Sequence, residues 1–217
     1  MPRSAPFGST LPWAEPSWYC GRPNPYYNGS HVRLRNHLRK WVDGNFAGKS
    51  EEWEAAGRIP RSVYSQCAKA GLLVPVAAGK TIPKEWERFG IVAGIKAEEW
   101  DGFHDFILWD ELARSGPLAS LFTGLVVGAP PIKAFASKEL QSRCVSILPG
   151  FHSAHELIRI LPEVLSGEKE ICLAITEPSA GSDVRNITTT AEKTPDGRYY
   201  VVNGEKKISD SDCFAKD

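Results

Sequence analysis

The chain has 217 residues with 26 basic and 26 acidic side chains, so its formal net charge is zero. A balanced charge excludes the large cationic surface that nucleic-acid binding or a polybasic membrane patch requires. Hydrophobic residues at 42% and charged residues at 24% are typical of a folded globular chain and argue against general disorder.

The cysteines and the chain ends bear on location. No two cysteines have Cys-x-x-Cys spacing, so the sequence predicts neither a zinc site nor a thioredoxin-type motif, only scattered reduced thiols in an intracellular protein. The amino terminus has no targeting pattern, and we expect a cytoplasmic or mitochondrial protein. The most apolar stretch, residues 118–136, is interrupted by two prolines and a lysine, and we expect no membrane span. The cysteines are Cys20, Cys67, Cys144, Cys172 and Cys213.

Residues 1–25 contain six prolines interleaved with Phe7, Trp13, Trp18 and Tyr19. Proline at this density prevents helix formation and favours an extended strap. The aromatic side chains suggest that the strap lies on the protein surface, and a disordered tail is the equal alternative.

The next segments follow helical spacing. Apolar residues over 30–46 predict a helix with Ser30 as its N-cap. A second helix is expected after Pro60, with Gly71 as its stop. Residues 75–95, which are rich in proline and glycine, are expected to form a loop.

Three further helices are expected before residue 150. The first runs from about Glu98 to Arg114, the second is apolar nearly all round over 119–127 and belongs in the core, and the third begins near Pro131 and includes 137–140. The residues that we expect the first of these to bury are Phe103, Phe106, Ile107, Trp109, Leu112 and Ala113.

After residue 170 the pattern changes from helical to alternating. Residues 171–176 and 187–191 are predicted strands, and 198–202 is a return strand after the turn Pro195-Asp196-Gly197. The sequence therefore predicts an α+β chain, with an all-α amino-terminal domain followed by an incomplete β domain.

The segment from Ala174 to Asp183 carries the chemistry. A strand delivers the Thr176 hydroxyl, and the chain then turns through Pro178 and Gly181 so that the Ser182 hydroxyl and several backbone N–H groups face one side. Such a nest of amides suits a phosphate or pyrophosphate, and a turn without a ligand is the alternative. The Thr176 hydroxyl is placed to donate to a ring carbonyl or nitrogen.

This segment closely resembles the FAD-binding signature of the acyl-CoA dehydrogenases. The resemblance extends over about 26–207 and includes Tyr26-Tyr27-Asn28, Asp110-Glu111-Leu112-Ala113-Arg114 and Asn203-Gly204-Glu205-Lys206-Lys207. The strap is similar to that of the family's fungal branch. The resemblance implies a strap over 1–25, a helical amino-terminal domain over 26–168, and a truncated, β-barrel-like middle domain over 169–217, with the carboxy-terminal helical domain absent.

The implied function is that of a flavoprotein oxidoreductase of fatty acid metabolism. Such an enzyme uses FAD to dehydrogenate an acyl-CoA thioester between its α and β carbons, passes the electrons to an electron-transfer flavoprotein or oxygen, and is a homo-oligomer at full length. Gly181 and Ser182 would hold the pyrophosphate, and Ser182 would also approach the acyl-CoA. The residues expected to lie against the flavin ring are Leu173, Ala174, Ile175 and Thr176, the last through its hydroxyl.

The sequence departs from the family pattern in its last residues. The family continues after this point with Trp-Ile-Thr, in which the tryptophan flanks the flavin and the threonine bonds it. With a one-residue deletion this chain would keep the isoleucine as Ile208 and have Ser209 in the threonine's role, and the tryptophan is absent. The family's catalytic glutamate lies in the carboxy-terminal domain, so we assign no catalytic residue and expect this truncated chain to be inactive. Glu177 is interpreted as structural. The alternative function is a non-catalytic remnant that acts as an interaction or regulatory module.

Residues 146–160 form an apparent insertion relative to the family. Two explanations stay open, an intron retained in the gene model and a genuine helical extension with a capping box at Ser153 to Glu156. His152 and His155 lie in this segment without a carboxylate or cysteine partner, and are interpreted as loop residues rather than metal ligands.

Overall fold

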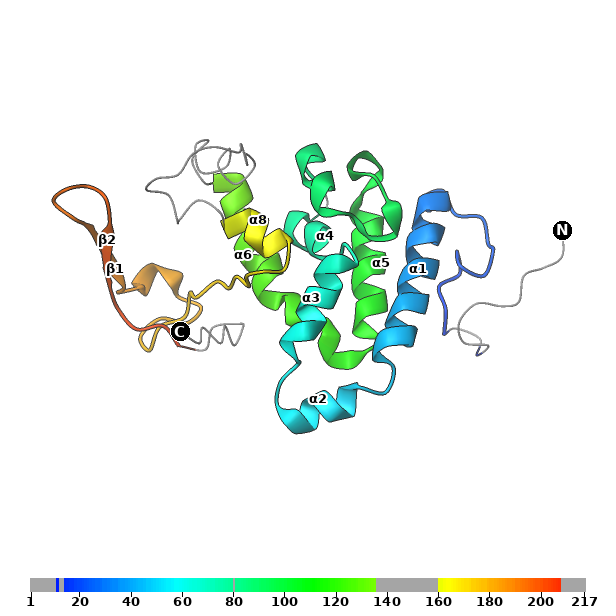
Figure 1. Cartoon of the computed structure of the whole chain (residues 1–217), viewed down its shortest axis with the longest axis horizontal. Coiled ribbons are helices and arrows are strands. Elements are labelled where there is room, and N and C mark those ends of the chain that lie inside the picture. Colours follow the sequence, from blue (N-terminus) through cyan, green and yellow to red (C-terminus); the bar gives the residue numbers. More distant parts are fainter. Residues whose placement is uncertain (1–10, 12–13, 80, 136–159, 208–217) are drawn as a thin grey trace.

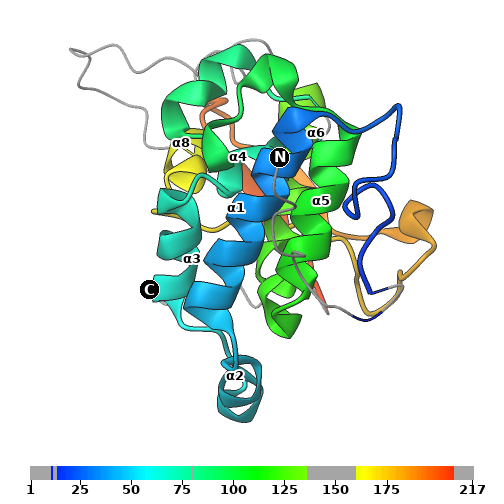
Figure 2. The same cartoon turned by 90° about the vertical axis from the view of Figure 1, so that its right-hand side faces the viewer.

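The computed structural model describes residue 11 and residues 14–79, 81–135 and 160–207. A helical bundle makes up most of the molecule, and a β-hairpin extends from one side of it (Figure 1). Helices α1 and α5 lie side by side in both views (Figure 2) and make the most extensive contact between two elements of the bundle. The α+β prediction is confirmed, with a helical amino-terminal domain and two strands in the described part of the middle region.

Helix α1, Gly29–Phe46, buries a stripe of Leu34, Leu38, Val42 and Phe46 at the predicted helical spacing. Its N-cap is Asn28, whose side chain accepts the Ser30 N–H, so the prediction of Ser30 as N-cap was wrong. The Ser30 side chain instead turns into the protein, where it contacts α5. The buried stripe then sets the face on which the bundle assembles.

The described part of the strap packs against α1. The Trp18 ring stacks on Tyr27, with 4.1 Å between centroids and 3° between planes. The Tyr19 hydroxyl donates to Asn36 Oδ1 at 2.5 Å, and Glu15 forms ion pairs with arginines of α1. Aromatic stacking and ion pairs together hold residues 15–19 on the bundle.

Two short helices follow, α2 over Ser50–Ala56 and α3 over Arg61–Lys69. The prediction for the region after them was wrong. Residues 75–95 are largely helical: α4 covers Leu73–Ala78 and short 3₁₀ turns cover Lys84–Phe89 and Val92–Gly94. Pro75 is compatible with α4 because it lies in the first turn, where an N–H has no partner within the helix.

Helix α5, Gly102–Ala113, begins later than predicted, at the N-cap Asp101. A 3₁₀ turn, Ala97–Glu99, occupies the expected first turn. Ile107 and Leu112 are buried as predicted, but Phe106 is 61% exposed and Phe103 and Ala113 are also exposed, whereas Glu111 is fully buried. The face that α5 turns toward α1 therefore includes a charged residue, which apolar periodicity cannot identify.

The apolar segment after α5 begins with two 3₁₀ turns, Gly116–Leu118 and Ser120–Phe122, and continues as α6, Thr123–Phe135. A separate helix from Pro131 was a wrong prediction, because α6 runs through Pro130 and Pro131; residues 137–140 lie outside the described part. Lys133 anchors the end of α6 by donating to the carbonyl oxygens of Ala78 (3.0 Å) and Thr81 (2.6 Å).

One helical run among the described residues, Gly116–Phe135, is long and apolar enough to cross a membrane by length and composition. In this fold the same run supplies Leu118, Phe122, Leu125 and Ala129 to the hydrophobic core. A core helix of this kind satisfies the same length and composition criterion, so the finding is weak evidence for a span. The expected absence of a membrane span stays a prediction.

The remaining elements lead away from the bundle. Helix α8, Ile160–Leu165, contacts α4, and of the apparent insertion only Ile160 lies within the described residues. The expected hairpin is present, with β1, Thr190–Lys193, antiparallel to β2, Tyr200–Asn203. The strand predicted over 171–176 was wrong: this segment has no strand partner in the described part of the chain, and a strand exists only through pairing.

Candidate functional site

The candidate site begins in the extended segment 171–176, which passes α6 on its way to the hairpin. It lies close to Gly128 of α6, where an added Cβ would be 3.4 Å from Ile171 Cγ1. Of the four residues expected at a flavin ring, Leu173 and Thr176 are half-buried, whereas Ala174 and Ile175 are exposed. The segment therefore presents accessible apolar surface beside a threonine whose hydroxyl has no partner among the described residues.

A tight turn follows the segment. Glu177 N–H donates to Ala180 O at 2.9 Å and Ala180 N–H to Glu177 O at 3.1 Å, so the chain reverses through two residues. Gly181 and Ser182 come next and are exposed. Within the described residues, the N–H groups of Gly181, Ser182 and Asp183 donate to no acceptor. In the described part of the chain, the turn thus has three amides without an acceptor beside the Ser182 hydroxyl.

The Glu177 carboxylate holds this turn in place. It is buried and accepts hydrogen bonds from Thr188 N–H (2.6 Å), Thr188 Oγ1 (2.8 Å), Thr189 N–H (3.0 Å) and Lys206 Nζ (2.7 Å). The hydrogen bond from Lys206, with those from Thr189 and Thr188, holds the pKa of Glu177 well below its usual range. The carboxylate therefore links the turn to residues before β1 and after β2.

Lys206 completes the site in a way that sequence reasoning missed. Its ammonium also donates to Ile175 O at 3.1 Å, and the N–H of Lys207 donates to Thr176 O at 2.9 Å. Lys206 belongs to the segment Asn203-Gly204-Glu205-Lys206-Lys207 that carries part of the family resemblance. What sequence could not show is that the chain after β2 brings Lys206 beside Glu177. Ser209, predicted at the same site, lies outside the described residues.

A second cluster of potential ligands, His31, Asp101 and His104, joins the N-termini of α1 and α5. His31 Nδ1 accepts the Asn28 N–H at 3.0 Å, so Nε2 carries the proton and donates to Asp101 Oδ1 at 3.0 Å. Ser30 Oγ donates to Asn28 Oδ1 at 2.6 Å and therefore accepts from His104 Nε2 at 2.9 Å. A metal ion would need the His31 Nε2 lone pair, which the proton occupies. The cluster is thus a double helix cap.

Sequence spacing contains a signal for this double cap. Asn28 and His31, and likewise Asp101 and His104, stand at the N-cap and third position of their helices, the spacing of a capping box. Burial lowers the pKa of His104, which favours the neutral ring, and the two rings stack with centroids 3.8 Å apart. The hydrogen bonds and the stacked rings thus hold two helix starts together.

Replacement of Asp101 by alanine is expected to lower the free energy of unfolding by about 2–4 kcal/mol, because it removes the α5 cap and leaves the buried His31 N–H unsatisfied. Asp101→Asn is the matched control, since it keeps the accepting oxygen and should cost less than half as much. Urea unfolding at pH 7 measures both values. Equal losses for the two variants would contradict the cap assignment.

The pH dependence of this cap has a definite sign. The pKa of Asp101 is lowered to about 2 by hydrogen bonds from His31 and His104, which outweigh its desolvation, so its stabilising contribution is present above its ordinary value and is lost as the pH falls toward 2. We expect the parent chain to lose stability between pH 4 and pH 2 more steeply than Asp101→Asn. Parallel curves over that window would contradict this expectation.

The chain matches two family profiles, acyl-CoA dehydrogenase, N-terminal domain, over residues 28–149, and acyl-CoA dehydrogenase, middle domain, over residues 172–213. Among curated proteins it is 44% identical over 205 residues to acyl-CoA dehydrogenase apdG of Emericella nidulans, with 92% of this chain and 43% of that protein covered. Both profiles follow the domain order described above.

Solved structures that resemble this chain are also acyl-CoA dehydrogenases. The fold is similar to that of acyl-CoA dehydrogenase from Geobacillus kaustophilus, with a TM-score of 0.61, 27% identity, and 86% of this chain and 41% of that chain covered. It is also similar to acyl-CoA dehydrogenase complexed with FAD from Bacillus anthracis, with a TM-score of 0.61, where 22% identity over 85% of this chain and 27% of that chain indicates a shared fold. The chain thus spans less than half the length of the relatives it matches.

Proposed function

The chain belongs to the acyl-CoA dehydrogenase family of flavoprotein oxidoreductases, and from that premise we propose that it contributes the flavin turn of an FAD-dependent enzyme that dehydrogenates acyl-CoA thioesters. The observation that carries the proposal is the turn after Glu177, where three successive amides and the Ser182 hydroxyl have no partner among the described residues. Free amides of this kind bind anionic oxygens, and the pyrophosphate of FAD supplies them.

The residues present fit the cofactor on both sides of the turn. The amides of Gly181 and Ser182 are exposed and suit the pyrophosphate, while Ala174 and Ile175 offer exposed apolar surface for a planar ring. Thr176 lies between these regions, and its hydroxyl has no partner in the described part of the chain. A dinucleotide that is charged at its centre and aromatic at its end matches this order of groups along the chain.

Bound FAD supplies the hydride acceptor for oxidation between the α and β carbons. Under this proposal residues 173–176 contact and orient the isoalloxazine ring, and the Thr176 hydroxyl donates to it. Gly181 and Ser182 hold the pyrophosphate, the Ser182 hydroxyl also contacts the acyl-CoA, and Ser209 makes a further flavin contact. Glu177 positions the turn. We assign no catalytic base within this chain, and propose an electron-transfer flavoprotein or oxygen as the electron acceptor.

A fluorescence titration with flavins tests the proposal. We expect the chain to bind FAD too weakly to survive gel filtration, because it spans less than half of its relatives, yet at least about tenfold more tightly than riboflavin, which lacks the pyrophosphate. The expected tenfold difference in affinity arises because the amides of the turn bind the phosphate groups of FAD, which riboflavin lacks. Equal affinity for FAD and riboflavin would remove the support for a pyrophosphate turn.

The variant Glu177→Gln tests the positioning role separately. It retains the size of the side chain but removes the charge that receives Lys206 and the Thr188 and Thr189 amides. We expect about tenfold weaker FAD binding and faster amide hydrogen exchange at Thr188 and Thr189. The matched control is Glu192→Gln in the exposed strand β1. Unchanged exchange at both threonines would show that the carboxylate does not hold the turn.

A second candidate function, a non-catalytic interaction module, is favoured by the hairpin surface. Both of its strands are exposed along their whole length, and Tyr200 and Val202 are 64% and 65% exposed. Exposed apolar strands associate readily with other chains. Light scattering distinguishes the candidates: FAD-independent assembly that Tyr200→Lys and Val202→Lys abolish would favour the module.

A further inference from the structure

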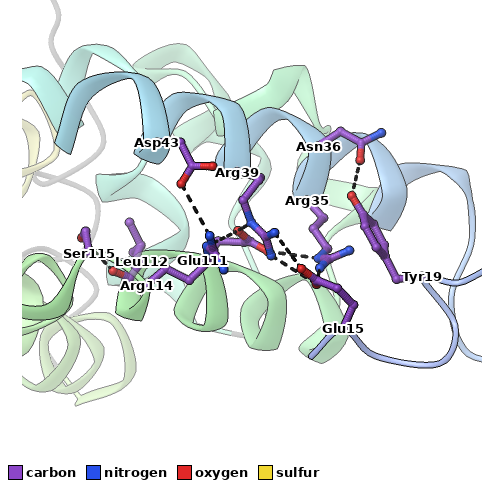
Figure 3. Close-up of polar contacts among 10 residues, drawn as sticks. All are labelled: Glu15, Tyr19, Arg35, Asn36, Arg39, Asp43, Glu111, Leu112, Arg114 and Ser115. Atoms are coloured by element: carbon purple, nitrogen blue, oxygen red, sulfur yellow. Dashed lines mark hydrogen bonds and ion pairs between the residues drawn. The ribbon is translucent and has the colours of Figure 1, made fainter. Parts of the chain in front are cut away.

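Two arginines of α1 form a buried socket at the strap. Arg35 and Arg39 are one helical turn apart on the same face, with side chains 1% and 6% exposed, and both bind the fully buried Glu111 of α5 (Figure 3). Arg39 Nε donates to Glu111 Oε2 at 2.6 Å and Arg39 Nη2 to Oε1 at 2.8 Å, while Arg35 Nε donates to Oε1 at 3.0 Å. One carboxylate thus receives both guanidinium groups.

The strap supplies a second carboxylate to the same socket. Glu15, 6% exposed, accepts from Arg39 Nη1 at 2.9 Å and from Arg35 Nη2, so its oxygens lie between the two arginines opposite Glu111 (Figure 3). Arg114 also lies 3.7 Å from Glu111, but it is paired with Asp43 at 3.6 Å, so these two charges offset each other. Without Glu15, the other described charges at this place, Arg35, Arg39 and Glu111, sum to a net positive charge. With it, the four side chains cancel. A buried uncompensated charge is strongly unfavourable, so the socket demands one further negative charge.

We propose that Arg35 and Arg39 form a binding site for a single monovalent carboxylate, which the chain's own Glu15 occupies in this structure. The strap is then a ligand held by its carboxylate, and a small free carboxylate takes the same place when the Glu15 side chain is removed. This inference does not depend on the flavin site.

The charge and shape of the socket select the class of ligand. The planar forks of two guanidinium groups match the two oxygens of a carboxylate. A phosphate or sulfate dianion would leave a net negative charge beside Glu111, so a monovalent ion fits better. A hollow of about 320 Å³ adjoins the socket and gives small ions a path to Arg39. Its lining residues are Ala14, Glu15, Pro16, Arg39, Asp110 and Arg114.

The test is chemical rescue of the full chain carrying Glu15→Ala. We expect this change to lower Tm by about 5–10 °C in sodium chloride at pH 7. Sodium formate at equal ionic strength should restore at least half of the loss with a saturable dependence, while sodium sulfate at equal ionic strength should not. The parent chain and the control Glu52→Ala, exposed on α2, should respond equally to formate and chloride.

Two further variants keep the test decisive. Adding Arg39→Leu to Glu15→Ala should abolish the formate response, because the fork that binds the ion is gone. If Glu15→Ala does not fold, Glu15→Ser, whose short side chain also leaves the place between the arginines empty, is refolded in formate and in chloride, and a higher yield in formate is expected. The proposal would be overturned if neither Glu15→Ala nor Glu15→Ser differed between formate and chloride, or if formate had an equal effect on the parent chain.

Discussion

Glu111→Gln is expected to lower the free energy of unfolding by about 3–5 kcal/mol, because it leaves two buried guanidinium groups with one carboxylate between them. The pKa of Arg35 is lowered to about 10 by burial, even though the Glu111 carboxylate opposes that shift, so the guanidinium remains charged at neutral pH. Urea unfolding followed by tryptophan fluorescence measures the loss. The control is Asp110→Asn, the exposed neighbour on α5, for which a change within about 0.5 kcal/mol is expected.

A double variant separates charge imbalance from lost hydrogen bonds. Arg39→Met with Glu111→Leu removes one charge of each sign and leaves Arg35 paired with Glu15. Because buried ion pairs replaced by apolar groups of similar size are often neutral in stability, we expect the double variant to be more stable than Glu111→Gln. A double variant that is less stable than Glu111→Gln would show that hydrogen bonding, not charge balance, dominates.

Gly71→Ala is expected to lower the free energy of unfolding by about 2–5 kcal/mol, from left-handed strain and a displaced backbone hydrogen bond. Gly71 has φ 77°, and its carbonyl oxygen accepts the Val92 N–H at 3.0 Å. An added Cβ would lie 2.8 Å from Val92 N and 2.9 Å from Ile91 C, so the methyl group has no space. The end of α3 and the 3₁₀ turn Val92–Gly94 would have to separate.

Gly57→Ala is the matched control for the cost of placing alanine in a left-handed backbone conformation. Gly57 also has a left-handed conformation, with φ 66°, but an added Cβ would meet nothing within 4 Å. Its expected cost is therefore only the conformational part, about 1–2 kcal/mol. Urea unfolding gives both values. Equal losses at the two positions would mean that the close approach of residues 91–92 contributes nothing.

Several elements could be predicted because they depend on local rules. The stripe from Leu34 to Phe46 and the hairpin turn at Pro195-Asp196-Gly197 encode their structures within a few residues. The loop prediction over 75–95 failed because proline in a first helical turn looks the same in sequence as proline in a loop. The burial pattern of α5 failed in part because Glu111 faces α1, where arginines distant in sequence compensate its charge.

In the candidate site, too, the locally determined features could be predicted and the contacts between distant residues could not. The turn at residues 177–183 was predicted from its residue types, because proline and glycine set the local backbone. The sequence favours a structural role for Glu177, and the side chain makes four hydrogen bonds in the fold. Its partner Lys206 could not be identified, because the hairpin that brings the two together is a pairing between separate segments.

The sequence by itself determined the class of the fold, the family and the tight turn after Glu177, since these follow from short-range patterns. Only the tertiary structure decided which charges meet: Glu15 with Arg35 and Arg39, Glu177 with Lys206, and His31 with Asp101. The reason is physical. A buried ion pair or helix cap depends on groups far apart in the chain that are desolvated together, and no local pattern encodes which distant partner compensates a given charge.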